Sequence, residues 1–86
     1  IVSERDRLYA EINDIDGVEV IPSKANFLLI RLDDSQGIYE KLIEEGISVR
    51  NFQYDSVLAQ YIRVSIGTED ENDKFLEVLL SKLEGR

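Results

Sequence analysis

The stretch YIRVSIGTEDENDKFLEVLLSKL, from Tyr61 to Leu83, constrains the fold more than any other part of this sequence. Its first six residues alternate apolar and polar side chains, which is the pattern of a strand with one buried face. Thr68 and Glu71 then fit a capping box, in which each side chain bonds the backbone N–H of the other residue. The stretch therefore predicts a strand that leads into a helix. The apolar stripe of this helix comprises Phe75, Leu76, Leu79, Leu80 and Leu83.

Hydrophobic periodicity divides the rest of the sequence into two more helices and three more strands. Asp16-Gly17 and Gly46 are expected to end the two helices, because glycine adopts a left-handed backbone without strain. The apolar run at residues 26–32 predicts a central strand that is covered on both faces. In chain order the expected elements are a helix over residues 3–13 or slightly beyond, strands over 18–21 and 26–32, a helix between the cap candidates at 33–35 and Gly46, strands over 47–52 and 61–66, and the C-terminal helix.

The order of these elements, α-β-β-α-β-β-α, predicts an α+β fold. We expect a small, mostly antiparallel sheet with its helices packed mainly on one face. The inward residues of the second helix are expected to be Ile38, Leu42 and Ile43, and the connection from Gln53 to Gln60 carries no strong turn signal.

The charge of the chain excludes several classes of partner. Ten Lys and Arg residues stand against eighteen Asp and Glu, a net charge of −8. Such a field repels the phosphate backbone of nucleic acids. The sequence has neither a basic amphipathic face for anionic lipid nor an apolar run near membrane-spanning length, so we expect no nucleic-acid or membrane partner.

Cysteine, histidine and methionine are all absent. Without cysteine there is no disulfide, thiolate metal site or cysteine nucleophile, and without histidine the commonest general base and metal ligand is missing. We therefore expect no metal site, and the lack of cysteine is compatible with a reducing, cytoplasmic location. Because a full-length product normally begins with methionine, we interpret the chain as a piece of a longer protein that starts partway along a helix.

Two arginines are candidates for a site because they lie in apolar strands of an acidic chain. Side chains alternate across a strand, so Arg50 points away from Ile47 and Val49, and Arg63 points away from its own apolar neighbours. If the apolar faces meet the helices, both guanidinium groups lie on the other face of the sheet. If the two strands are also antiparallel neighbours, the pair could serve one anionic ligand.

Periodicity alone favours a different interpretation, in which each arginine is solvated or paired with a nearby carboxylate. Asn26 is a weaker candidate for the same site, since an asparagine at the start of a strand more often satisfies backbone groups. Tyr54 and Tyr61 either line the same region or pack under the loop, and the sequence does not choose between these roles.

The segments ANFLL, GISVRNF and IRVSIGTEDENDKFLE occur in an order and spacing that resemble the C-terminal small domain of histidinol-phosphate aminotransferases. These are fold type I enzymes that depend on pyridoxal 5′-phosphate. The resemblance covers nearly the whole chain and implies that residues 1–86 form the substrate-binding small domain, without the large domain. It implies that the full enzyme is a homodimer that uses histidinol phosphate and glutamate or 2-oxoglutarate in histidine biosynthesis.

The resemblance also implies roles for individual residues. Arg63, in IRVSIGT, matches the arginine that pairs with the substrate carboxylate, and Arg50, in VRNF, matches an arginine that contacts the phosphate of histidinol phosphate. Because glutamate and histidinol phosphate use one site in alternation, Arg63 could meet either anion. A planar guanidinium pairs with a carboxylate through two parallel hydrogen bonds, which fixes the orientation of the substrate.

The resemblance implies that the Schiff-base lysine, the aspartate at the pyridine nitrogen and the phosphate cup belong to the large domain. Lys24, Lys41, Lys74 and Lys82 do not lie in the family's lysine motif, so no catalytic residue is expected in this chain. We expect pyridoxal 5′-phosphate to act in the full-length enzyme, and the chain alone to bind no cofactor and to be inactive.

Two alternatives remain at this point. The small domain of a related threonine-phosphate decarboxylase would share these features and also bind a phosphate-bearing amino compound, although the segment IGTEDENDKFLEVL favours the aminotransferase. A stand-alone α+β module for protein interaction or regulation would need an exposed apolar face or a dimer edge.

Overall fold

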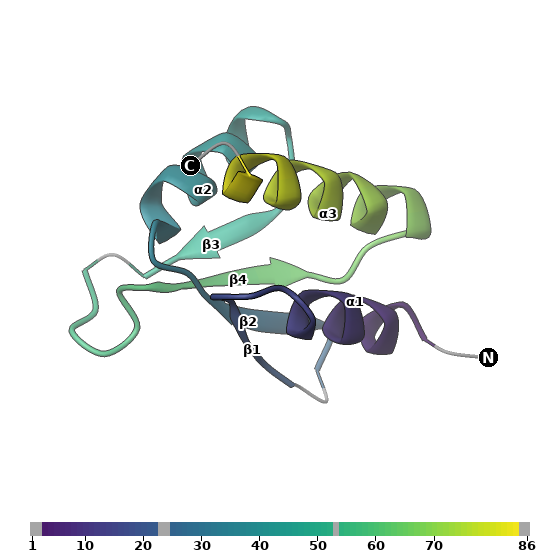
Figure 1. Cartoon of the computed structure of the whole chain (residues 1–86), viewed down its shortest axis with the longest axis horizontal. Helices are drawn as coiled ribbons and strands as arrows, with labels where there is room; N and C mark the ends of the chain where they lie inside the picture. Colours follow the sequence, from purple (N-terminus) through teal and green to yellow (C-terminus); the bar gives the residue numbers. More distant parts are fainter. Residues whose placement is uncertain (1–2, 23–24, 53, 85–86) are drawn as a thin grey trace.

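The computed structural model describes residues 3–22, 25–52 and 54–84, in which helices and strands follow one another in the predicted order. The elements are α1 (Glu4–Asn13), β1 (Glu19–Ile21), β2 (Phe27–Arg31), α2 (Ser35–Glu44), β3 (Val49–Asn51), β4 (Tyr61–Ser65) and α3 (Glu69–Glu84). Within the described residues the strand order is β1-β2-β4-β3, and each neighbouring pair is antiparallel. All three helices lie on the same side of this sheet (Figure 1), so the α+β prediction is confirmed.

The two earlier helices end differently. The first, α1, ends at Asn13, within the expected range and three residues before Asp16-Gly17, and the Asp14 N–H donates to the Ile12 carbonyl at this end. Gly17, with φ of +81°, instead lies in the turn before β1. The second, α2, ends as predicted, since Gly46 has φ of +79°. The N–H groups of Gly46 and of the next residue donate to carbonyls in the last turn of α2, both at 2.9 Å.

The capping box predicted for α3 is confirmed. The Glu71 N–H donates to Thr68 Oγ1 at 3.2 Å, and the Thr68 N–H donates to Glu71 Oε1 at 2.8 Å. The bond from the Thr68 N–H is the main cause that lowers the pKa of the Glu71 carboxyl below its ordinary value. The cap therefore fixes where the chain turns from β4 into α3.

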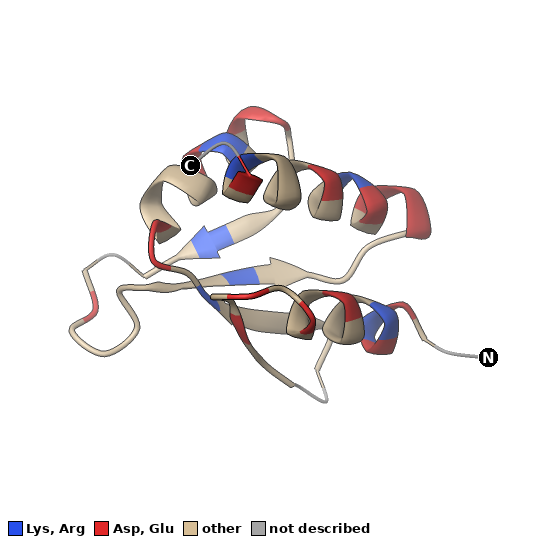
Figure 2. Cartoon of the chain, viewed as in Figure 1, with Lys and Arg blue, Asp and Glu red and all other residues tan. Residues whose placement is uncertain are grey.

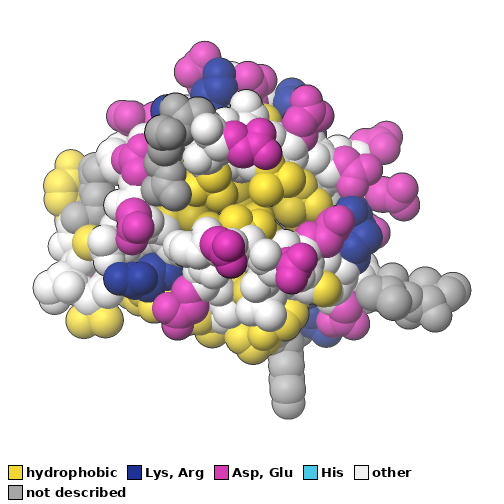
Figure 3. All heavy atoms as spheres, in the orientation of Figure 1, with side chains coloured by type: hydrophobic (Ala, Val, Ile, Leu, Met, Phe, Trp, Pro, Cys, Tyr) yellow, Lys and Arg dark blue, Asp and Glu magenta, His cyan; other side chains and the backbone are white. Residues whose placement is uncertain are grey.

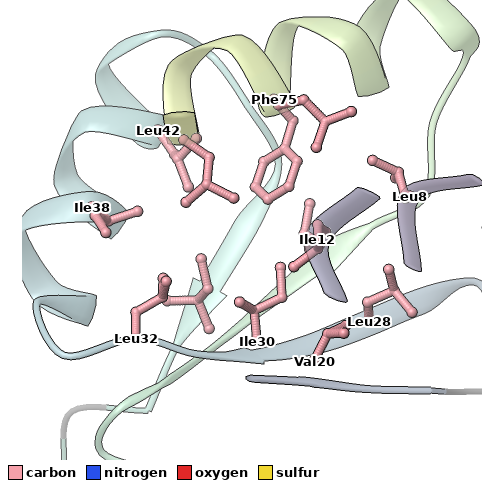
Figure 4. Close-up of a cluster of buried hydrophobic side chains, with 13 residues drawn as sticks. Leu8, Ile12, Val20, Leu28, Ile30, Leu32, Ile38, Leu42 and Phe75 are labelled. Carbon is pink, nitrogen blue, oxygen red and sulfur yellow. The ribbon is translucent and has the colours of Figure 1, made fainter. Parts of the chain in front are cut away.

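The hydrophobic core lies between the sheet and the helix layer (Figure 4). Two residues expected to face inward are instead exposed: Ile43 at 47% and Leu80 at 41%. An α-helix turns by about 100° per residue, so a residue next to a buried one, such as Leu42 or Leu79, is carried to the edge of the stripe. The buried apolar residues are Leu8, Ile12, Val20, Leu28, Ile30, Leu32, Ile38, Leu42, Ile62, Val64, Phe75, Leu76 and Leu79.

The central strand β2 is covered on one face only by the described residues. Leu28 and Ile30 are fully buried against the helices, whereas Phe27, Leu29 and Arg31 on the other face are half-buried. The expectation of cover on both faces is therefore wrong for this chain. We call the uncovered side of the sheet the open face; the described residues on it are Glu19, Ile21, Phe27, Leu29, Arg31, Arg50, Tyr61, Arg63 and Ser65.

Candidate functional site

The open face carries both predicted arginines, one on each of two adjacent strands (Figure 2). In the antiparallel pairing of β3 with β4, Arg50 and Arg63 are direct Cα partners. Val49 and Val64 are the next pair along, and their side chains turn toward the helices. Because successive side chains alternate, the same register that buries the valines places both arginine side chains on the open face.

Neither arginine is neutralised by an acid among the residues that the structure describes. Within the described residues no ion pair or hydrogen bond joins the side chain of Arg50 or Arg63 to a carboxylate. Arg7 in α1 is the contrast, since its guanidinium lies 2.7 Å from Glu4 and 2.8 Å from Asp73. A bound anion would relieve the repulsion between Arg50 and Arg63, since neither pairs with an acid in residues 3–22, 25–52 and 54–84.

Charge is segregated between the two layers of the fold (Figure 2). The three helices contain eleven acidic and five basic residues, a net charge of −6, whereas the four strands contain three arginines and one glutamate, a net charge of +2. The strands therefore carry an excess of basic side chains on a protein whose total charge is −8.

Two further residues on the open face were not predicted from the sequence as part of the site. Phe27 lies on the open face with Cζ of Arg63 5.0 Å from its ring centroid. Arg31, also on the open face, donates from Nη2 to Gln60 Oε1 at 2.9 Å and is the cross-strand partner of Glu19. Both could have been found by extending the period-two alternation from Arg63 to the neighbouring strand, once the register between β2 and β4 was known.

Of the other candidates, Asn26 and Tyr54 do not join the arginine pair, whereas Tyr61 shares the open face with it. Asn26 lies two residues before Leu28, whose side chain is buried against the helices, so by alternation Asn26 does not share the open face. Its Nδ2 donates to the Ile66 carbonyl at 3.3 Å. This is the backbone-satisfying role that the sequence favoured. Tyr54 is 94% exposed in the loop, whereas Tyr61 is half-buried on the open face.

The loop before β4 has a turn that the sequence did not reveal. Asp55 Oδ1 accepts from the N–H groups of Val57 and Leu58 at 2.7 and 2.8 Å, and these bonds lower the pKa of the Asp55 carboxyl. Gln53, at the start of the expected loop, lies outside the described residues. The turn stands directly before Tyr61 and so fixes where β4 begins.

A polar network at the other end of β4 connects α1 with α3. Asn72, 2% exposed, accepts from the Gly67 N–H at 2.9 Å and donates to the Gly67 carbonyl at 3.1 Å and to Glu4 Oε1 at 3.0 Å. Arg7 pairs with the same carboxylate, which lowers the pKa of Glu4 and raises that of Arg7. Since Gly67 follows β4 by two residues, the network anchors the strand that carries Arg63.

None of the lysines that the structure describes lies on the open face. Lys41 pairs with Glu44 and Glu45 at 3.7 and 3.5 Å, and Lys74 and Lys82 lie on α3, in the layer opposite the arginines. Lys24 is outside the described residues. In the same ranges no cluster of three candidate metal ligands occurs, and none of the helices is long and apolar enough to cross a membrane.

The helix layer has a hollow of its own. A cavity of about 580 Å³ lies between α1 and α3, and its apolar wall is visible as the yellow area at the centre of Figure 3. Acidic side chains surround it, and the arginine pair is on the other side of the sheet. The residues that line it are Glu11, Asp14, Ile15, Asp16, Leu76, Leu80, Leu83 and Glu84.

The chain is similar in sequence to known enzymes and in structure to solved proteins. No protein-family model matches the chain. Over 80 residues, 92% of the chain, the sequence is 48% identical to histidinol-phosphate aminotransferase from Aquifex aeolicus, of which the match covers 23%. The structure of L-threonine-O-3-phosphate decarboxylase from Porphyromonas gingivalis matches with a TM-score of 0.81 at 26% identity, over 94% of this chain and 26% of that one. A decarboxylase from Sulfurospirillum multivorans matches with a TM-score of 0.78 at 30% identity, over 93% and 24% of the respective chains.

The chain thus spans about a quarter of the length of the relatives that it matches. A second aminotransferase of the same name, from Ruminiclostridium cellulolyticum, is 42% identical over 92% of the chain, so the resemblance inferred from the sequence is confirmed. The chain is therefore similar, over most of its own length, to about one quarter of the length of proteins named histidinol-phosphate aminotransferase.

Proposed function

We propose that this chain is the C-terminal, substrate-binding small domain of an aminotransferase that exchanges an amino group between histidinol phosphate and 2-oxoglutarate. The observation that carries the proposal is the facing pair Arg50 and Arg63, which lies on the open face with no carboxylate partner among the described residues. The names of the relatives support the same assignment.

In this function the two arginines bind and orient the anionic groups of the substrate. Arg63 is central on the sheet and half-buried, which suits a fixed, bidentate bond to a carboxylate. Arg50 is on the edge strand and exposed, which suits a phosphate on a longer or more variable substrate. Because glutamate carries no phosphate, the exposed arginine would be used fully in only one of the two half-reactions.

The family implies pyridoxal 5′-phosphate in the full enzyme, where it supplies the chemistry of amino transfer. The described residues offer no lysine at the open face, so the rest of a longer enzyme would have to hold the cofactor. We propose accordingly that this chain alone is inactive, and that the complete enzyme is a cytoplasmic homodimer of histidine biosynthesis.

A threonine-phosphate decarboxylase is the second candidate, because the solved structure with that activity in its name superposes on 94% of the chain. The sequence identity is 26% to that protein and 48% to the aminotransferase from Aquifex aeolicus, which favours the aminotransferase. Assays of the full-length enzyme with histidinol phosphate plus 2-oxoglutarate, and separately with threonine phosphate, would distinguish the two. Turnover of threonine phosphate without turnover of histidinol phosphate would refute the aminotransferase proposal in favour of the decarboxylase.

The role of Arg63 can be tested by Arg63→Lys in the full-length enzyme. Lysine keeps the charge and loses the two-pronged hydrogen bond, so the rate of the glutamate half-reaction should fall by roughly 10²–10³. Arg5→Lys in α1, in the opposite layer, makes the same chemical change and should leave the rate within about twofold. A loss of less than about tenfold for Arg63→Lys in single-turnover assays would refute the role.

A further inference from the structure

We propose that Phe27 is a positioning residue for Arg63: its ring supports one face of the guanidinium group and leaves the N–H edges available to a substrate anion. The inference rests on the proposed function, in which Arg63 binds that anion. Phe27 begins β2 on the open face and is half-buried. Cζ of Arg63 lies 5.0 Å from the centroid of its ring.

The register of the sheet produces this contact. In the pairing of β2 with β4, Leu29 is the Cα partner of Arg63 and Ser65 is the partner of Phe27, so Phe27 and Arg63 are diagonal neighbours on one face. Diagonal neighbours lie about 7–8 Å apart and are within reach of aromatic and long side chains. A slip of one residue would turn Phe27 toward the helices and leave Arg63 without its ring.

A ring holds an arginine in a way that an acid cannot. A cation within about 6 Å of a ring centroid is attracted to the ring face, and this attraction uses none of the N–H donors. A carboxylate would occupy the donors and compete with the substrate, as Glu4 and Asp73 occupy those of Arg7. Within the described residues, Arg63 keeps its donors free of protein acceptors while the ring limits its orientation.

The second arginine reinforces this orientation. Since β4 lies between β2 and β3, Arg63 has Phe27 on one flank and Arg50 on the other. Repulsion from Arg50 disfavours movement of the Arg63 side chain toward β3, and attraction by the ring favours β2. The guanidinium group is therefore held from both sides before any substrate arrives.

The geometric part of the proposal can be tested by NMR on the 86-residue chain. Protons above an aromatic ring are shielded by its ring current, so the Arg63 Nε–H proton should be shifted upfield. Phe27→Leu keeps an apolar strand residue and removes the ring, and should move this resonance downfield. Phe27→Tyr keeps the ring and should retain the shift. An Arg63 resonance that is unchanged in Phe27→Leu overturns the proposal.

The functional part needs the full-length enzyme. Phe27→Leu should raise KM for glutamate by roughly two- to fivefold with kcat within about twofold, and Phe27→Tyr should restore the wild-type KM. Tyr9→Leu, which removes a half-buried ring from α1 in the helix layer, should leave KM unchanged. Equal effects of Phe27→Leu and Tyr9→Leu would mean a general packing role and would overturn the inference.

The failure of this inference is distinguishable from failure of the proposed function. If Arg63→Lys abolishes the glutamate half-reaction while Phe27→Leu leaves KM unchanged, only the role of Phe27 is refuted. If Arg63→Lys has no effect, the proposed function itself is refuted. Should Phe27→Leu not fold, Phe27→Trp replaces it, because tryptophan gives the strongest ring attraction and must keep both the shielded resonance and a KM no higher than wild type.

Discussion

Replacement of Arg50 by glutamine should stabilise the chain, even though the net charge then grows from −8 to −9. Arg50 and Arg63 are direct cross-strand partners, and like charges directly opposite each other destabilise a sheet by about 0.2–1 kcal/mol. Two charges about 7 Å apart in water repel by about 0.6 kcal/mol before salt screening, which agrees with that range. For a domain of this size, about 0.5 kcal/mol should raise Tm by roughly 2–4 °C.

The assay is urea unfolding followed by circular dichroism, in about 10 mM and in about 1 M salt, between which the screening length falls from about 30 to 3 Å. The gain in unfolding free energy should be present at low salt and absent at high salt. Arg31→Gln is the matched control, because Arg31 lies on the same face but opposite Glu19. It makes the same change in net charge, removes an attraction instead of a repulsion, and should give no gain.

Two results would refute this reasoning. Arg50→Gln could fail to exceed the wild type at low salt, which would mean that the guanidinium groups do not interact. Alternatively its gain could persist at high salt, which would mean that strand propensity rather than charge is responsible. Inorganic phosphate provides an independent arm: it should stabilise the wild type more than Arg50→Gln, since an anion relieves repulsion only where both cations are present.

Three further predictions concern stability. Gly46→Ala should lower the unfolding free energy by about 1 kcal/mol in urea titrations, because φ is +79°; an unchanged midpoint would contradict the left-handed cap. Leu42→Ala, in the core, should lower the unfolding free energy by about 2–5 kcal/mol, whereas Ile43→Ala, at an exposed position, should lower it by less than about 1 kcal/mol. Equal losses in the two variants would contradict the finding that Leu42 is buried and Ile43 is exposed. The pKa of Glu71 is lowered on folding, so its stabilisation is complete above its ordinary pKa of 4.5 and is lost as the pH falls through the lower folded value. Glu71→Gln should therefore reduce the loss of stability below about pH 4.5, and an identical acid limb of the pH profile would contradict the cap.

The features that the sequence could predict are local ones. Arg50 and Arg63 were assigned to one face because side chains alternate strictly along a strand, and their assignment required no knowledge of distant contacts. The same holds for the helix ends at Gly46 and Thr68, where a glycine or a capping pair acts within five residues. In each case the physical cause is contained in the segment itself.

The features that were missed depend on contacts between distant segments. Asn72 bonds Glu4 across 68 positions of sequence, and no local pattern marks either residue as part of a network. The contact of Phe27 with Arg63 depends on the register between β2 and β4, which turn chemistry and packing decide together. Ile43 was misplaced because the buried stripe of α2 is narrower than its apolar sequence suggests.

The open face contains apolar residues that favour cover by another part of an enzyme and arginines that disfavour such cover when no anion is bound. Phe27, Leu29 and Tyr61 are half-buried and apolar enough to favour cover, whereas Arg50 and Arg63 beside them are two cations without acidic partners among the described residues. To bury such a pair without a counter-charge costs several kcal/mol, but with an anion present the lower dielectric strengthens the same arginine–anion bonds. If the rest of a longer aminotransferase covers this face, cover and anion binding must therefore favour each other, because each reduces the free-energy cost of the other. Mutation of Arg50 to a neutral residue would weaken this coupling and make a covered state without a ligand more accessible.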